Sequence, residues 1–232
     1  MQKRIWAMVL MTLGLVAAMA TVGIGSQQSD GRVFVVSYVE VAPASDAQAL
    51  ALLKTYRDAG RRGEGNMRLE ILQQEGRAGH FVVVEEWRDQ QAHQGHRQAG
   101  HTTQLHEKLN PLRVGPYDER THTSLPAAPA APTAGGSVLV VTHIDVIPKG
   151  LEQVREILKT VVDASRKDAG NVRFDILQGV RQNHFTVVEA WRDARAREAH
   201  LATAHARTFR GDLYQHAVDG APYDERLYRV VP

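Results

Sequence analysis

The chain has 232 residues and no cysteine, so disulfides, a thiolate nucleophile and cysteine-based zinc or iron–sulfur sites are all excluded. It also has little excess charge of either sign, because the formal net charge is only +2 and basic and acidic residues are interleaved. No basic stripe with interleaved aromatic residues is present, which argues against nucleic acid as a partner. The apolar share of 43% and the charged share of 23% are those of an ordinary globular protein.

Long hydrophobic runs are confined to the N-terminus. Lys3 and Arg4 precede an uncharged run over residues 5–25, and this run contains the small-x-small site Ala18-Met19-Ala20. A basic start, an apolar run and such a site are typical of a signal peptide. An uncleaved anchor is the alternative, because about 20 apolar residues can just cross a bilayer. We therefore predict an exported protein, periplasmic or secreted, with any membrane attachment confined to residues 1–25.

The remaining chain is a tandem repeat. Roughly 35 of about 90 aligned positions are identical, which is far beyond chance for a period of this length. We predict a first domain at 32–123 (copy one), an Ala/Pro-rich linker at 124–136 and a second domain at 137–232 (copy two). The recurring motifs are Leu-Lys-Thr, Gly-Asn-x-Arg, Ile-Leu-Gln, His-Phe, Glu-x-Trp-Arg-Asp, two spaced histidines and Pro-Tyr-Asp-Glu-Arg.

Hydrophobic periodicity predicts the same elements in both copies. Asp89 and Asp193 are placed to cap the start of the second helix in each copy. A last strand follows each Tyr-Asp-Glu-Arg segment, so the order β-α-β-β-α-β predicts a ferredoxin-like α+β domain. In copy one the expected strands are 33–41, 67–73 and 80–87, and the first helix is 45–62. In copy two the expected strands are 138–146, 172–178 and 184–191, and the first helix is 150–167.

The first strand of copy two is apolar on both faces. Val140 and Ile144 lie on one face, whereas Leu139 and Val141 lie on the other. A sheet covered on one side only would be polar on its other side. We therefore expect the two copies to pack sheet against sheet within one chain.

The ordered motifs Gly-Asn-x-Arg, His-Phe-x-Val-x-Glu-x-Trp-x-Asp and Ala-x-x-x-His-x-x-x-x-His resemble the antibiotic biosynthesis monooxygenase family over nearly all of both copies. The resemblance implies a dimeric α+β barrel, made here by tandem fusion. It also implies oxygenation of quinols, anthrones or other phenolic rings with O₂, without metal or flavin. Similar folds serve haem degradation and isomerisation, so the fold alone does not set the reaction.

His96 and His200 are the candidate bases. Each lies on the apolar side of the second helix, where an imidazole that titrates near neutrality could take a phenolic proton. The alternative is a core histidine satisfied by a neighbouring strand or by Glu85 or Glu189.

His101 and His205 lie five residues further on. Five residues turn a helix by about 500°, so the two imidazoles of one copy would diverge by about 140°. From an unbroken helix they could not bind one metal ion, and we predict no metal site. They are assigned to substrate contact, with a helix kink or cap as the alternative.

Asn66 and Asn171 lie at a turn, where asparagine also recurs for conformational reasons. Their amides could instead hold a ring oxygen or polarise O₂. Arg68 and Arg173 could stabilise a phenolate or superoxide, or pair with a carboxylate across the strands.

Trp87 and Trp191 end the third strand of each copy, where a tryptophan most often packs under a helix. Stacking against an aromatic ligand is the alternative. The remaining proposed substrate contacts are Phe81, Phe185, Ser37 and Thr142.

The two copies are not equivalent. Copy two, with Glu198-Ala199-His200-Leu201, is closer to the family pattern, whereas Gly95 weakens the corresponding helix of copy one. The alternatives are therefore two active copies, or one active copy and one that has become a scaffold.

The leading hypothesis is a cofactor-independent monooxygenase that oxidises a quinol or another phenolic, polyketide-like ring with O₂. The first alternative is a non-enzymatic binding protein for a small aromatic or stress-related molecule. The second is haem binding through His106, whose counterpart in copy two is Arg210. A Soret band on haem titration would support that second alternative.

The export hypothesis gives a direct prediction. N-terminal sequencing of the secreted material should start near Thr21, because cleavage is expected after Ala20. Recovery of intact Met1 in the membrane fraction would show an anchor instead.

Overall fold

A computed structural model describes residues 31–125, 133, 136–216 and 224–232, so the predicted signal segment and most of the linker lie outside the described residues. In copy one the elements are β1 (Val33–Glu40), α1 (Asp46–Gly60), β2 (Asn66–Gln74), β3 (His80–Trp87), α2 (Gln90–Arg97), α3 (Gly100–Leu109) and β4 (Asp118–Leu125). In copy two they are β5 (Val138–Asp145), α4 (Leu151–Ser165), β6 (Asn171–Gly179), β7 (His184–Trp191), α5 (Ala194–Leu201), α6 (Ala204–His216) and β8 (Asp224–Val230). Short 3-10 turns occupy Pro43–Ser45, Asn110–Leu112 and Pro148–Gly150.

The second helix of each copy differs from the expectation. Where one helix was predicted, the chain forms two, α2 and α3 in copy one and α5 and α6 in copy two. The predicted caps are confirmed, because Asp89 and Asp193 accept hydrogen bonds from the backbone N–H groups of Ala92 and Ala196, both at 2.8 Å. The order is therefore β-α-β-β-α-α-β in each copy.

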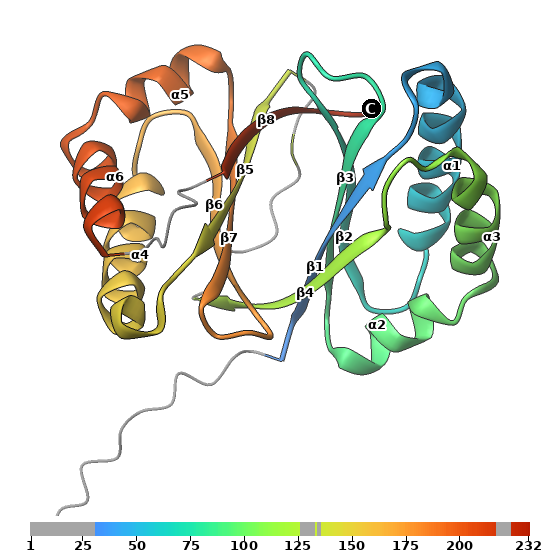
Figure 1. Cartoon of the computed structure of the whole chain (residues 1–232), viewed down its shortest axis with the longest axis horizontal. Helices are drawn as coiled ribbons and strands as arrows, with labels where there is room; N and C mark the ends of the chain where they lie inside the picture. The colour runs from blue at the N-terminus through green and yellow to red at the C-terminus, as the bar shows by residue number, and fades with distance from the viewer. Residues whose placement is uncertain (1–30, 126–132, 134–135, 217–223) are drawn as a thin grey trace, which may run out of the picture.

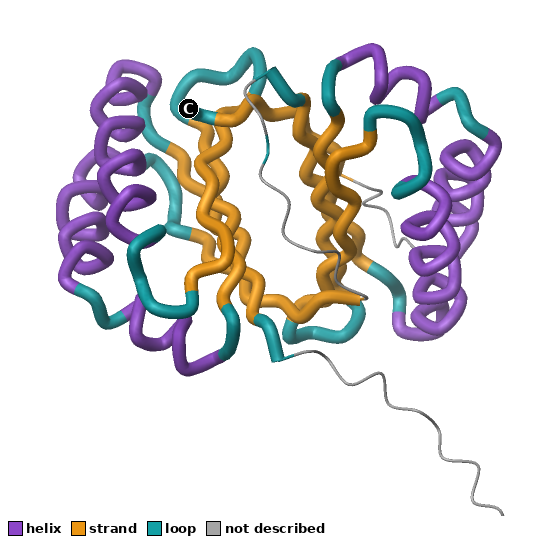
Figure 2. The backbone as a smooth tube through the Cα atoms, turned by 180° about the vertical axis from the view of Figure 1, so that it is seen from behind, coloured by secondary structure: helices purple, strands orange, loops and turns teal. Residues whose placement is uncertain are grey.

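The eight strands close into one barrel in the order β1-β3-β2-β8-β5-β7-β6-β4. Each copy supplies an antiparallel four-stranded sheet, and the copies join where β4 pairs with β6 and β2 pairs with β8. Strand β4 continues to Leu125, two residues into the predicted linker. Figure 2 shows the strands enclosed between the two sets of helices, so the expected sheet-to-sheet α+β barrel is confirmed.

Each sheet is apolar on both faces, as the first strand of copy two predicted. Val140 and Ile144 pack against α4 and α6 in the core of copy two. Leu139 and Val141 face the barrel interior, where they join Val36 and other side chains of copy one. The helices α1–α3 and α4–α6 cover the outer faces (Figure 1).

Buried ion pairs also lie inside the barrel. Arg173 lies 3.1 Å from Glu70 of the other copy, and Arg68 lies 3.4 Å from Glu86 and 3.7 Å from Asp175. All five side chains are buried or nearly so. Because an unpaired buried charge is strongly unfavourable, the two pairs that join the copies, Arg173–Glu70 and Arg68–Asp175, hold the two sheets in one register.

Among the described residues, no helix combines the length and the apolar composition needed to cross a membrane.

The inter-copy ion pair yields a stability prediction. Arg173→Met removes the cation and leaves Glu70 buried without its partner, so the free energy of unfolding should fall by about 3–5 kcal/mol in urea denaturation. Arg173→Met/Glu70→Leu removes both charges and should recover most of that loss. A single variant as stable as the wild type would show that the pair does not hold the copies together.

Candidate functional site

A hollow of about 390 Å³ opens on the helix side of the copy-one sheet. Its position is set by the end of β3, the α1–β2 turn, α2 and the break between α2 and α3. Small residues at four lining positions leave the space open. The lining residues are Gly63, Glu64, Trp87, Arg88, Gln91, Ala92, Gly95, His96, Ala99 and His101.

The break between α2 and α3 brings two histidines together. The hydroxyl of Thr102 donates to the carbonyl of His96 at 2.7 Å, which satisfies the end of α2 while the chain turns. His96 Nδ1 then lies 3.2 Å from His101 Nε2. The predicted divergence of about 140° was wrong, because it assumed one continuous helix.

His96 belongs to a buried chain of hydrogen bonds. The hydroxyl of Tyr56, on α1, lies 2.6 Å from His96 Nε2 and 2.8 Å from Glu85 Oε1. The indole N–H of Trp87 donates to the other carboxylate oxygen of Glu85 at 2.8 Å. The series Glu85, Tyr56, His96 and His101 therefore runs without a gap from the core to the rim of the hollow.

Burial sets the protonation states along this chain. Desolvation raises the pKa of Glu85 to about 7, although the bonds from Tyr56 and Trp87 act in the opposite direction. Desolvation and the neighbouring His101 lower the pKa of His96 to about 3. The pKa of Tyr56 is raised well above 10, chiefly by burial. At neutral pH, His96 is therefore neutral, Tyr56 keeps its proton, and Glu85 is the group that titrates.

Copy two keeps only part of this arrangement. The N–H of Trp191 donates to Glu189 at 2.8 Å, and burial again raises the pKa of that carboxyl to about 7. Val161 stands where copy one has Tyr56, and Asp168 stands where it has Gly63. His200 Nδ1 lies 2.7 Å from an oxygen of Asp168, so its partner differs from that of His96.

The polar residues of β2 and β6 do not join either histidine cluster. The amides of Asn66 and Asn171 donate to the backbone carbonyls of Arg68 and Arg173 at 3.2 and 3.3 Å, which matches the conformational alternative. Arg68 and Arg173 lie on the barrel side of the sheets, opposite the imidazoles, and pair with carboxylates there. This matches the alternative of pairing with a carboxylate across the strands, Arg173 with Glu70 and Arg68 with Asp175.

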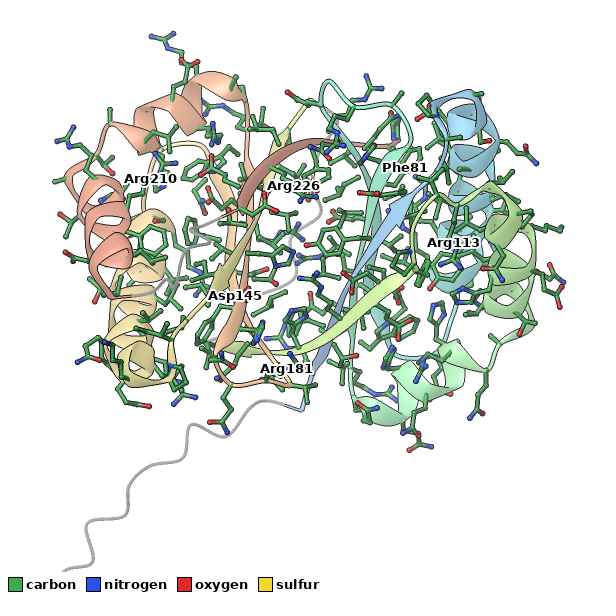
Figure 3. All side chains as sticks on the ribbon, in the orientation of Figure 1. Phe81, Arg113, Asp145, Arg181, Arg210 and Arg226 are labelled. Carbon is green, nitrogen blue, oxygen red and sulfur yellow. The ribbon has the colours of Figure 1, made fainter. Side chains whose placement is uncertain are left out.

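The other predicted substrate contacts lie mainly in the cores. Phe81 and Phe185 pack between sheet and helices, and Figure 3 shows Phe81 there in copy one. Ser37 and Thr142 are buried within the strands β1 and β5. None of these four lines the hollow, whereas Trp87 forms part of its wall.

Tyr56 and Asp168 were missed in the sequence. Each occupies a position where the copies differ, Tyr56 against Val161 and Asp168 against Gly63. Such positions are not part of any recurring motif, so the repeat does not point to them. A tyrosine on the apolar face of a helix, absent from the other copy, was the available signal for Tyr56.

The chain was compared with protein families and known structures. A family model described as antibiotic biosynthesis monooxygenase matches residues 32–108 and 137–212, one match in each copy. A Bacillus subtilis (strain 168) protein named "Putative monooxygenase YcnE" is 30% identical over 73 residues, which are 31% of this chain and 77% of that protein.

Two solved structures share the whole tandem architecture. A "putative monooxygenase" from Fusobacterium nucleatum has a TM-score of 0.79 at 16% identity and covers 87% of this chain and 93% of its own. An "anthrone oxidase-like protein" has a TM-score of 0.65 at 14% identity, with 87% and 92% covered. At these identities the two structures show a common fold.

The raised pKa of Glu85 predicts a pH-dependent stability. Unfolded, this carboxyl ionises near pH 4.5; folded, it ionises near pH 7, so stability present below pH 4.5 is lost as the pH rises through this window. Glu85→Gln cannot ionise and retains an acceptor for Trp87. Between pH 5 and pH 8 the wild type should lose on the order of 2–3 kcal/mol more than Glu85→Gln in urea unfolding.

Glu189→Gln is the matched variant in copy two, because its carboxyl is shifted in the same direction for the same reason. It should reduce the pH dependence similarly. Parallel pH profiles for the wild type and Glu85→Gln would contradict the buried, protonated carboxyl.

Proposed function

The chain belongs to the antibiotic biosynthesis monooxygenase family, and from this we propose that copy one oxygenates a quinol or another phenolic, polyketide-like ring with O₂. The hydrogen-bonded series from Glu85 to His101 at the rim of the hollow is the observation that carries the proposal. We also propose that the reaction takes place outside the cytoplasmic membrane, as the N-terminal segment predicts.

The reaction requires removal of one phenolic proton before O₂ can react. A phenolate is electron-rich and passes one electron to O₂, and the resulting radical pair combines at a ring carbon to give a peroxide. The peroxide anion takes one proton back, which restores the base, and loss of water then converts the ring C–H, the phenolic O–H and O₂ into two C=O groups and H₂O. The substrate supplies all the electrons, so the task left to the protein is to bind the ring and take its proton.

Glu85 is the proposed destination of that proton. When it is ionised, Tyr56 donates to it, His96 donates from Nε2 toward Tyr56, and His101 donates from Nε2 to His96 Nδ1. The Nδ1 lone pair of His101 is then free to accept the phenolic proton. Transfer of one proton along each bond leaves every imidazole neutral and protonates Glu85.

The acidities favour this direction. The pKa of Glu85, about 7, lies close to the operating pH, where a general base works best. The pKa of His96, about 3, makes a lasting imidazolium unfavourable. His96 is therefore suited to pass a proton on and unsuited to keep it, which modifies the expectation of a histidine as the terminal base.

The dimensions of the hollow support an aromatic ligand. A volume of about 390 Å³ lies in the range of small-molecule sites. Gly63, Ala92, Gly95 and Ala99 let a flat ring approach, and the fully buried Trp87 closes the hollow beneath them.

Oxygen uptake with a panel of quinols and anthrones tests the proposal. Tyr56→Phe removes the bridging hydroxyl and leaves only a 3.4 Å contact between His96 Nε2 and Glu85 Oε2. It should lower kcat/KM by about 10²–10⁴-fold, as should His96→Ala. Wild-type activity should rise with pH through about 7, as Glu85 ionises.

Tyr38→Phe is the matched control, because it removes another tyrosine hydroxyl of copy one, on the barrel side of β1 and away from this series. It should retain activity, and thermal melts should show all variants folded. The loss of oxygen uptake in His200→Ala measures how much of the activity comes from copy two. Full oxygen uptake by the folded Tyr56→Phe and His96→Ala variants would contradict proton transfer along the series. Binding of the ring without oxygen uptake would favour the non-enzymatic alternative.

A further inference from the structure

In copy two, three metal-ligating side chains converge on one point. Asp168 Oδ2 lies 2.7 Å from His200 Nδ1 and 2.8 Å from His205 Nε2. Within the described part of the chain, this is the group in which three such ligand atoms all lie within 4.8 Å of one another. The residues come from the turn after α4, from α5 and from α6.

The spacing suits a shared ion. Two nitrogen or oxygen ligands, each about 2.1 Å from a metal, lie about 3.0 Å apart at the right angle of an octahedral site and about 3.4 Å apart at the tetrahedral angle. The observed separations of 2.7 and 2.8 Å are hydrogen-bond distances, so the side chains would have to move apart by up to about 0.7 Å to admit an ion. Two imidazoles with one carboxylate form the ligand set of several zinc and non-haem iron centres.

Neighbouring groups hold the ligands in place. The ring of His200 stacks on Trp191 with centroids 4.5 Å apart. The hydroxyl of Thr203 donates to the carbonyl of His200 at 2.7 Å and lies 3.1 Å from His205 Nε2, which fixes the break between α5 and α6. His200 is buried, whereas Asp168 and His205 are partly exposed, so an ion can reach the cluster from solvent.

Copy one provides the natural contrast. Gly63 occupies the position of Asp168, and His96 and His101 contact each other directly. Two neutral nitrogens without a carboxylate make a poorer site, because the negative charge that balances a divalent ion is missing. The two copies thus join the same pair of histidines differently, by a direct nitrogen–nitrogen contact in copy one and through a carboxylate oxygen in copy two.

We propose that Asp168, His200 and His205 bind one divalent first-row transition-metal ion of the Zn²⁺, Fe²⁺ or Co²⁺ type. Imidazole nitrogens favour these ions over Mg²⁺ and Ca²⁺, which prefer oxygen ligands. Three protein ligands leave coordination positions open to water or a small molecule. The site is separate from the hydrogen-bonded series from Glu85 to His101 in copy one.

Titration of the metal-free full chain, without a histidine tag, with Co²⁺ tests the site. The wild type should bind one Co²⁺ per chain with a visible d–d absorption band, and Zn²⁺ should displace it. Asp168→Asn keeps the shape but removes the charged ligand, and it should weaken binding at least about 100-fold, since loss of a group that only hydrogen-bonds to a ligand already weakens binding about 10–100-fold. His205→Ala should have the same effect.

His101→Ala is the matched control, because it is the same change at the equivalent position of copy one. It should bind Co²⁺ like the wild type, and circular dichroism should show each variant folded. Undiminished binding by folded Asp168→Asn and His205→Ala would overturn the site, as would the absence of Co²⁺ binding by the wild type. Oxygen uptake by copy one is measured separately, so either proposal can fail alone.

Discussion

Burial of both faces of each sheet is the constraint on which the structure depends. One face packs against the copy's own helices, and the other can be covered only by the sheet of the second copy. Edge pairing of β4 with β6 and of β2 with β8 leaves no open sheet edge in the barrel. The interior is filled mainly with apolar side chains and ion pairs, and the outer layer between sheet and helices also holds polar groups. Both histidine clusters lie there.

Fusion of the copies frees them to differ. In a symmetric dimer each change would appear twice, whereas here Tyr56 faces Val161 and Gly63 faces Asp168 across the repeat. The shared Glu-x-Trp pair keeps the same hydrogen bond of 2.8 Å in both copies. A common scaffold therefore carries a tyrosine-linked series in one copy and a carboxylate-linked pair of histidines in the other.

The repeat, the strands, the aspartate caps and the paired sheets could all be predicted from the sequence, because each depends on local periodicity or on a recurring motif. The helix break could not, since its cause is a hydroxyl that satisfies the carbonyl of His96 or His200 only after the chain has turned. The face of the sheet on which Arg68 and Arg173 lie could not be predicted from the sequence either. Alternation along a strand shows which residues share a face, but here both faces are buried, and position alone does not tell barrel from helix side.

The buried carboxyls connect the fold to the site. Keeping Glu85 in the core opposes folding at neutral pH, because its ionised form is poorly solvated there. The rest of the barrel offsets that term, and Trp87 and Tyr56 hold the carboxyl in one orientation. The same burial that raises the pKa of Glu85 lowers the pKa of His96, so one low-dielectric environment reverses the ordinary order of the two pKa values, 4.5 for the carboxyl and 6.5 for the imidazole. A proton that enters through His101 therefore passes from His96, a group of low pKa, to Glu85, a group of higher pKa. A solvent-exposed histidine pair would lack this difference in pKa.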